Sequence, residues 1–268
     1  MYKRQVFSHA NSFPASTYKL LFKSLKARGY SVKAVDKYGH DPRYPVTDNW
    51  PHVVQQLVDY ATKVVDKAGE PVWLVGHSLG GFLSLMAAAR HPELARGLVL
   101  IDSPILGGWR SKALGLAKTT QLVGAISPGV VSRARRNSWP SAEAALGHFQ
   151  HKKAFAKWDP QVLQDYVDAF PEDAEGKRTL DFDRAIETAF YNTLPDNLDR
   201  LLARHPVKCP VTFIGGDQSA EMKQVGMAMT EKVTRGRIMM LDGSHLFPME
   251  KPLATAAALE AALRNMEP

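Results

Sequence analysis

The pentapeptide Gly76-His77-Ser78-Leu79-Gly80 holds a single serine between two glycines and fits the pattern G-x-S-x-G. A serine hydroxyl is a weak nucleophile unless a base accepts its proton and an anion site stabilises the charge that forms. The apolar run Val72–Val75 before it is typical of a buried strand, and a helical pattern follows from Leu79 to Arg90. In that setting, small glycines allow a sharp strand-to-helix turn that exposes Ser78. The pattern therefore predicts a nucleophilic serine.

The chain has nine histidines, and one of them must accept the proton of Ser78 if this serine reacts. His245 directly follows Arg237–Leu241, the last predicted strand, and a parallel sheet delivers such loops to the edge that bears Ser78. The side chain of His77 is expected to project away from the nucleophile. The other histidines that follow predicted strands are His9 and His40. Position in the sheet alone therefore leaves several candidates open.

Two aspartates could orient the base. Asp217 follows the predicted strand Val211–Ile214, and Asp102 follows the predicted strand Gly97–Ile101. An acid beside the histidine would fix its tautomer and stabilise its protonated form. Either side chain could reach the edge of the sheet, but Asp217 comes one strand before His245 in the chain.

Short strand-like segments alternate with amphipathic helices, which predicts an α/β protein with a mostly parallel sheet flanked by helices. We expect about six strands, all of them parallel. The predicted strands are Gln5–Ala10, Val32–Asp36, the run that begins at Val72, Gly97–Ile101, Val211–Ile214 and Arg237–Leu241. The predicted helices include one around Tyr18–Leu25, Asn49–Lys67, Leu79–Arg90 and a C-terminal helix.

The strand pattern stops between residues 105 and 205, where the sequence shows mostly helical spacing. This stretch is too long to be a loop in a compact domain. We predict a core of residues 1–104 and 206–268 and a helical cap of residues 105–205, inserted before the penultimate strand. The basic residues in the first half of the cap could attract an anionic substrate or form a solvated face. They are Arg110, Lys112, Lys118, Arg133, Arg135, Arg136, Lys152, Lys153 and Lys157.

The overall composition limits the classes of partner. The 268 residues include 34 basic and 27 acidic side chains, a net charge of +7, without a basic arm or an arginine stripe, so we expect no nucleic acid partner. There is no run of about 18 apolar residues, and the first residues do not form a signal segment. We therefore expect a cytoplasmic protein without stable membrane insertion. A single cysteine, Cys209, excludes an internal disulfide framework.

Three local motifs resemble signatures of the α/β-hydrolase fold family, in its Ser-His-Asp branch with an inserted cap. They are the elbow at Ser78, the turn Phe213–Asp217 and the loop Gly243–Pro252. The turn Asp36–His40 is similar to the family's D-x-x-G-H turn, so the resemblance covers nearly the whole chain except the cap.

The resemblance implies a catalytic triad that needs no metal and no organic cofactor. Ser78 would be the nucleophile, His245 the general base and Asp217 the acid that holds the imidazole. Asp102 is the alternative acid, because some members of the family supply it from the earlier strand.

The resemblance also implies an oxyanion hole. Matching the family's His-Gly-x onto His9-Ala10-Asn11 assigns the hole to the backbone N–H groups of Leu79 and Asn11. Two features depart from the family: Ala10 replaces the usual glycine, and only a few residues precede the first strand where a hairpin often stands. The side chain of Asn11 could instead form an Asx turn within its own loop, and His9 would brace that loop.

By this resemblance, we expect hydrolysis of carboxylic esters with small or medium acyl chains through an acyl-enzyme intermediate. Other activities on the same fold are those of a thioesterase, a small-amide hydrolase, a carbon–carbon bond hydrolase, a perhydrolase, a lyase or a non-catalytic ligand receptor. A serine at the elbow differs from the dehalogenase and epoxide hydrolase branches, which place a carboxylate there. The presence of all three triad members argues against the receptor.

Overall fold

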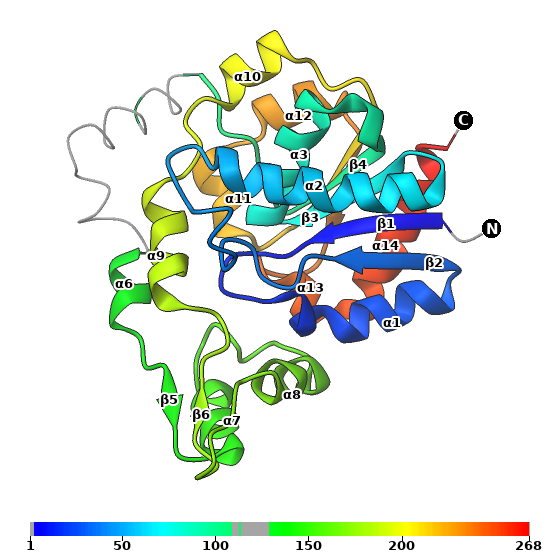
Figure 1. Ribbon diagram of the computed structural model, residues 1–268. Coiled ribbons are helices and arrows are strands. Elements are labelled where there is room, and N and C mark those ends of the chain that lie inside the picture. The colour runs from blue at the N-terminus through cyan, green and yellow to red at the C-terminus, as the bar shows by residue number, and fades with distance from the viewer. Residues whose placement is uncertain (1–2, 109–112, 114–128, 268) are drawn as a thin grey trace.

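A six-stranded parallel sheet forms the centre of the computed structural model, which describes residues 3–108, 113 and 129–267 (Figure 1). The strands lie in the order β2-β1-β3-β4-β7-β8, and each neighbouring pair is parallel. The predicted fold class is therefore confirmed. The strands are β1 (Lys3–Ser8), β2 (Tyr30–Ala34), β3 (Val72–His77), β4 (Ala95–Ile101), β7 (Val211–Gly216) and β8 (Ile238–Leu241).

The central strands are apolar on both faces because helices cover both sides of the sheet. Every residue of β3 and β7 is buried, and β4 exposes only Arg96. The edge strands β2 and β8 are mostly half-buried. The continuous apolar runs therefore identify the middle of the sheet, where the loops that follow the strands converge.

Two helical layers enclose the sheet (Figure 1). On one face α2 (Pro51–Ala68) packs against α3 (Leu79–Arg90), and on the other α1 (Lys19–Ala27) packs against α14 (Pro252–Asn265). The shorter helices of the sheet-forming part are η1 (Ala15–Tyr18), η2 (Pro92–Leu94), α11 (Ala220–Val225), α12 (Ala228–Thr234) and α13 (Phe247–Glu250). No helix in the described ranges combines the length and apolar character needed to cross a membrane.

The described part of the 105–205 segment is mainly helical. It contains α6 (Gly129–Ala134), β5 (Ser138–Trp139), α7 (Ala142–Gln150), α8 (Pro160–Asp168), β6 (Arg178–Thr179), α9 (Arg184–Asn192) and α10 (Leu198–Arg204). The antiparallel pair β5–β6 was not predicted, since two-residue strands are too short to show alternation. Helix α8 contacts η1 and α1, and α10 contacts α3. Of the basic residues noted above, Arg110, Lys112 and Lys118 lie outside the described residues.

Strand boundaries differ from the sequence prediction near the site. The first strand ends at Ser8, before the predicted end at Ala10. The N–H of Ala10 donates to the hydroxyl of Tyr18, and the ring of His9 bonds the carbonyl of Ala10, so both polar groups of Ala10 leave the ladder. A strand ends where its backbone groups find other partners, and here those partners hold the loop beside Ser78.

Candidate active site

Ser78 lies between β3 and α3 in a strained backbone conformation, with φ 52° and ψ −115°. The flanking glycines make this turn possible. A Cβ atom on Gly80 would lie 2.0 Å from the carbonyl oxygen of Ser8, and one on Gly76 would lie 2.1 Å from the carbonyl oxygen of Gly80. The Ser78 N–H donates to the carbonyl of Ile101 at 2.9 Å, which ties the turn to β4. The strand, the elbow and the helix thus have the arrangement that the sequence predicted.

His245 lies in the loop between β8 and α13, and its Nε2 is 2.9 Å from the Oγ of Ser78. The side chain of Glu250 holds this loop, because it accepts hydrogen bonds from the backbone N–H and the hydroxyl of Ser244. Among the histidines that follow strands, His245 is therefore the one in contact with Ser78. His40 bonds the backbone of Tyr38 and Asp183 instead.

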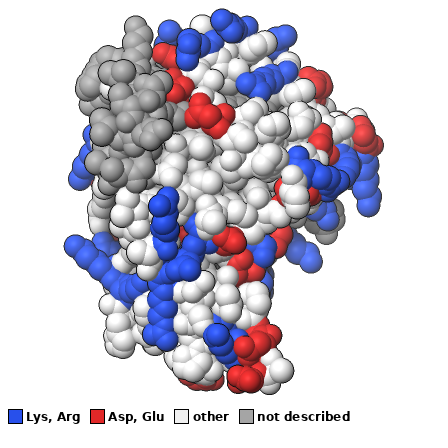
Figure 2. All heavy atoms as spheres, turned by 60° about the vertical axis from the view of Figure 1, so that its left-hand side comes forward, with Lys and Arg blue, Asp and Glu red and all other residues white. Residues whose placement is uncertain are grey.

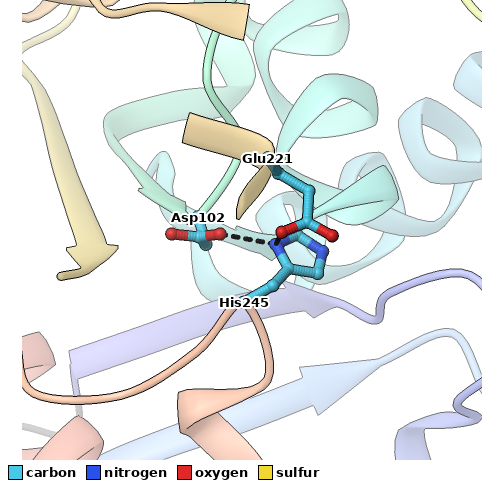
Figure 3. A group of neighbouring side chains, drawn as sticks. All are labelled: Asp102, Glu221 and His245. Atoms are coloured by element: carbon cyan, nitrogen blue, oxygen red, sulfur yellow. Dashed lines mark hydrogen bonds and ion pairs between the residues drawn. The ribbon is translucent and has the colours of Figure 1, made fainter. Parts of the chain in front are cut away.

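Asp102 is the acid that contacts the histidine: its Oδ2 lies 2.5 Å from Nδ1 of His245 (Figure 3). The side chain is buried and has two more donors, the backbone N–H of Gly216 at 3.0 Å and the hydroxyl of Ser219 at 2.6 Å. Three donors therefore surround this one buried carboxylate and fix its position. The φ of Asp102 is +43°, a second strained position beside the nucleophile.

Asp217, the acid expected from the sequence, is not in contact with His245. Its side chain is exposed, and its Oδ1 accepts the backbone N–H of Gly243 at 3.0 Å. The N–H of Asp217 also donates to the carbonyl of Leu241 at 2.9 Å, which extends the pairing of β7 with β8. Its carboxylate therefore closes a turn. Asp102 directly follows β4, the neighbour of β3 in the sheet, and takes the position beside the base.

The charges around His245 stabilise its protonated form. Burial lowers the pKa of His245, but the hydrogen bond and the charge of Asp102, together with the charge of Glu221, outweigh burial and raise the pKa above its ordinary value. The Oε2 of Glu221 lies 3.8 Å from Nδ1 of the ring, and Figure 3 shows both carboxylates directed at it. Sequence reasoning missed Glu221 and Ser219. Ser219 is the N-cap of α11, where its hydroxyl accepts the N–H of Met222. A serine directly before a helical segment is the signal that could have pointed to it.

The same three side chains could in principle hold a metal ion, since ligand atoms of Asp102, Glu221 and His245 lie within 4.8 Å of one another. Ligand atoms of a tetrahedral zinc site stand roughly 3.4 Å apart, as follows from metal–ligand bonds of about 2.1 Å. The separation of 2.5 Å between Asp102 and His245 is shorter than that and suits a shared proton. The arrangement fits an acid and a base better than a metal centre.

Leu79 and Asn11, the two residues expected to form the anion site, line the same cavity as Ser78 and His245. Leu79 is the first residue of α3, where the N–H has no partner within the helix and the helix dipole favours negative charge. The side chain of Asn11 donates to the carbonyl of Glu187 at 3.1 Å, so it reaches α9 rather than its own loop.

His9 braces the loop that carries Asn11, as expected. Its Nε2 accepts the N–H of Tyr38 at 2.9 Å, so its Nδ1–H donates to the carbonyl of Ala10 at 2.8 Å. Burial lowers the pKa of His9 to about 4, which keeps this tautomer neutral. Since the carbonyl of Ala10 and the N–H of Asn11 belong to one peptide unit, His9 fixes the plane of that N–H.

A cavity of about 1510 Å³ opens at the edge of the sheet beside Ser78. Its lining is mainly apolar and comes from both the sheet-forming part and the 105–205 segment. The residues around it include Phe13, Trp50, Phe82, Phe155, Phe190, Tyr191, Leu194 and Leu198, with the charged Arg135, Lys153, Lys157, Glu187 and Glu221. Figure 2 shows Lys and Arg side chains gathered in the lower part of one face, on the 105–205 segment.

Comparison with known proteins agrees with this architecture. The model of the alpha/beta hydrolase family matches residues 5–258. The chain is 24% identical over 274 residues to a serine hydrolase-like protein of Dictyostelium discoideum, covering 90% of this chain and 69% of that protein. It is 26% identical over 243 residues to Lipase LipV of Mycobacterium tuberculosis, covering 87% and 83% of the two chains.

Among solved structures, the thioesterase domain from the curacin biosynthetic pathway is similar with a TM-score of 0.74 at 19% identity, covering 97% of this chain and 91% of that one. At this identity the likeness shows a shared fold and nothing finer. The family match, in contrast, extends from β1 to α14 and includes the serine elbow and the histidine loop. The chain therefore belongs to the alpha/beta hydrolase family.

Proposed function

We propose that this protein is a serine hydrolase that cleaves carboxylic esters through an acyl-enzyme intermediate. The observation that carries the proposal is the continuous contact from Ser78 to His245 to Asp102, with donor–acceptor distances of 2.9 and 2.5 Å. This order of hydroxyl, imidazole and buried carboxylate matches the roles of nucleophile, base and orienting acid. In this assignment Asp102 takes the role that the family resemblance implied for Asp217.

In the proposed reaction, Ser78 Oγ attacks the ester carbonyl while Nε2 of His245 takes the hydroxyl proton. Asp102 stabilises the imidazolium that forms, and the N–H groups of Leu79 and Asn11 hold the oxyanion. The imidazolium then gives its proton to the leaving alcohol, which departs and leaves Ser78 acylated. A water molecule deprotonated by His245 attacks the acyl-enzyme, and release of the acid restores the hydroxyl of Ser78.

We propose that residues 105–205 act as a cap that shapes the substrate cavity. Trp50 packs against Phe82 and Phe190, which joins α2, α3 and α9 in one apolar wall. This wall begins one turn along α3 from Leu79, so the acyl chain would extend along it from the serine. An apolar wall of this kind suits a small or medium acyl chain, and the similarity to a lipase supports an ester substrate.

The test is hydrolysis of p-nitrophenyl esters from acetate to palmitate, with a matched acyl thioester beside each ester. The proposal predicts ester turnover that is lost in Ser78→Ala and peaks at a short or medium chain. Ser78→Ala keeps the oxyanion donors and the substrate cavity, so the loss is expected to leave only a slow residual rate. A wild-type protein that prefers the thioesters would favour the thioesterase, and one that cleaves neither class would contradict the proposed function.

A further inference from the structure

A chain of buried hydrogen bonds connects the loop of Asn11 to the loop of His245 without passing through the reacting atoms. The N–H of Ala10 lies 3.1 Å from the hydroxyl of Tyr18, and that hydroxyl lies 2.7 Å from Nδ1 of His77. On the other side of the ring, Nε2 of His77 lies 2.9 Å from the carbonyl oxygen of His245. Tyr18 is 2% exposed and His77 is fully buried, so water does not compete for these groups.

The two ends of this chain fix the direction of every hydrogen bond in it. A backbone N–H can only donate, so the N–H of Ala10 gives its hydrogen to the oxygen of Tyr18. A carbonyl can only accept, so the hydrogen on His77 must be on Nε2, where it points to His245. Nδ1 of His77 is then an acceptor, and the phenol hydrogen of Tyr18 has that nitrogen as its partner.

The electrostatic setting keeps the chain in this one arrangement. Burial, together with the neighbouring His245, lowers the pKa of His77 to about 3. Burial also raises the pKa of Tyr18. Both groups are therefore neutral across the pH range in which a hydrolase of this kind is assayed, and a second hydrogen on His77 would leave the Tyr18 hydrogen without an acceptor.

Building on the proposed function, we propose that Tyr18 and His77 are positioning residues that hold the oxyanion loop and the general base in register. Ala10 precedes Asn11, whose N–H is the oxyanion donor, and the other end of the chain is the backbone of the base itself. His9 also holds the peptide plane of Asn11, because its ring bonds the carbonyl of Ala10. Such a link matters because a misplacement of about 1 Å at reacting groups can cost about 10²-fold in rate.

The first test compares Tyr18→Phe with Tyr38→Phe, using the kcat and KM of an ester that the wild type cleaves. Tyr38 is the matched control, since it is a fully buried tyrosine whose hydroxyl bonds the hydroxyl of Ser8 at 2.9 Å. That hydrogen bond does not belong to the series that joins Ala10, Tyr18, His77 and His245. Tyr18→Phe is expected to lower kcat by about 10- to 100-fold with KM changed less than about 3-fold. A kcat for Tyr18→Phe equal to that of Tyr38→Phe would overturn the inference.

The second test asks whether the two residues act as one unit. His77→Leu removes the central member of the series of hydrogen bonds. His77→Gln retains an N–H that can reach the carbonyl of His245. We expect kcat to be recovered in part by His77→Gln, and the double variant Tyr18→Phe/His77→Leu to be no slower than the slower single variant. Losses that multiply, with no recovery by glutamine, would mean two independent structural roles and would overturn the inference.

Nitrogen chemical shifts of His77 in the wild-type protein provide a readout that does not depend on turnover. We expect a protonated Nε2 and an unprotonated Nδ1. The opposite tautomer would contradict the hydrogen-bond directions given above. If the wild type cleaves no ester, the proposed function fails and the positioning role fails with it. If the wild type is active and Tyr18→Phe equals its control, the positioning role alone fails.

Discussion

Asp102 and His245 share a hydrogen bond of 2.5 Å, and the carboxylate of Asp102 is buried. The other oxygen of Asp102 and the hydroxyl of Ser219 link this pair to the end of β7 and the start of α11. The acid is thus held by two elements that come after the 105–205 segment in the chain, although the residue itself comes before it. This arrangement determines how the site should respond to substitution.

Replacing Asp102 by asparagine should nearly abolish turnover. The amide would favour a tautomer of His245 that cannot accept the proton of Ser78, and in a triad of this type that change lowers kcat by about 10⁴-fold. Asp217→Asn is the matched control: it removes an exposed charge and weakens one turn, so kcat should stay within about 3-fold of wild type. Steady-state kinetics on both variants decides, and equal losses would contradict the assignment of the acid.

The pH dependence of kcat/KM should report the pKa of His245. Only the neutral ring accepts the serine proton, so activity falls as the pH drops through this pKa, which lies above the ordinary value. Glu221→Gln removes one of the charges that raise it, so the acid limb should move to lower pH. Glu231→Gln, at an exposed residue of α12, serves as the control. An acid limb that moves equally in both variants would show that Glu221 has no specific effect.

Gly80→Ala should prevent or strongly weaken folding. The added Cβ would lie 2.0 Å from the backbone of β1, which cannot move aside easily, so the loss of unfolding free energy should be about 3 kcal/mol, the upper end of the usual range for overpacking. Gly147→Ala is the opposite case, because this glycine lies within α7 and a Cβ there meets nothing within 4 Å. That variant should gain about 0.5–1 kcal/mol. Denaturant midpoints of the two variants measure the contrast, and similar midpoints would contradict the close packing at the elbow.

The ion pair between Arg135 and Glu187 should stabilise the contact between the 105–205 segment and the loop that carries Asn11 and Ser12. Glu187 is 3% exposed, and its Oε1 accepts from Ser12 Oγ at 2.5 Å and from Arg135 Nη1 at 3.0 Å. Burial raises the pKa of Glu187, and Arg135 opposes that rise. Arg135→Ala leaves the carboxylate unpaired and should cost about 3–5 kcal/mol at neutral pH.

The loss of stability in Arg135→Ala should depend on pH. Without Arg135 the folded-state pKa of Glu187 rises further above its unfolded value, so stability is lost as the pH rises through the folded pKa and is recovered below it. Arg136→Ala is the control, since its guanidinium donates to the exposed backbone carbonyl of Ser138 and lies over the ring of Trp139. Thermal unfolding of both variants between acidic and neutral pH measures the difference. A destabilisation that does not depend on pH would contradict the role of the buried charge.

The sequence predicts which strands and loops form this site better than it predicts the order of the strands in the sheet. Ser78 could be located because its strained turn requires glycines that are visible in the sequence. His245 was one of several histidines near strand ends, and the resemblance of the loop Gly243–Pro252 to a family motif singled it out. The acid was predicted wrongly: Asp217 was preferred over Asp102 because it precedes His245 by one strand in the chain, although both residues follow strands that end at the same edge. Their distances from His245 depend on which strand lies next to β3, and that order is a property of the packed sheet.

The supporting contacts were also hidden, because they join residues that are distant in the chain. Tyr18 shows only helical spacing in the sequence, yet its hydroxyl contacts His77 across the sheet edge. Glu187 belongs to an ordinary amphipathic helix, and its partner Arg135 was one of several basic residues without a distinguishing pattern. Such roles arise from burial and pairing, which single-sequence patterns do not record.

The most direct test is to treat the folded protein with a fluorophosphonate and to map the adduct by mass spectrometry of its peptides. We predict one adduct per chain, on Ser78, that forms rapidly in wild type and about 10³-fold or more slowly in His245→Ala because the base is missing. An unlabelled protein, or one labelled at another residue, would contradict the claim that Ser78 is an activated nucleophile.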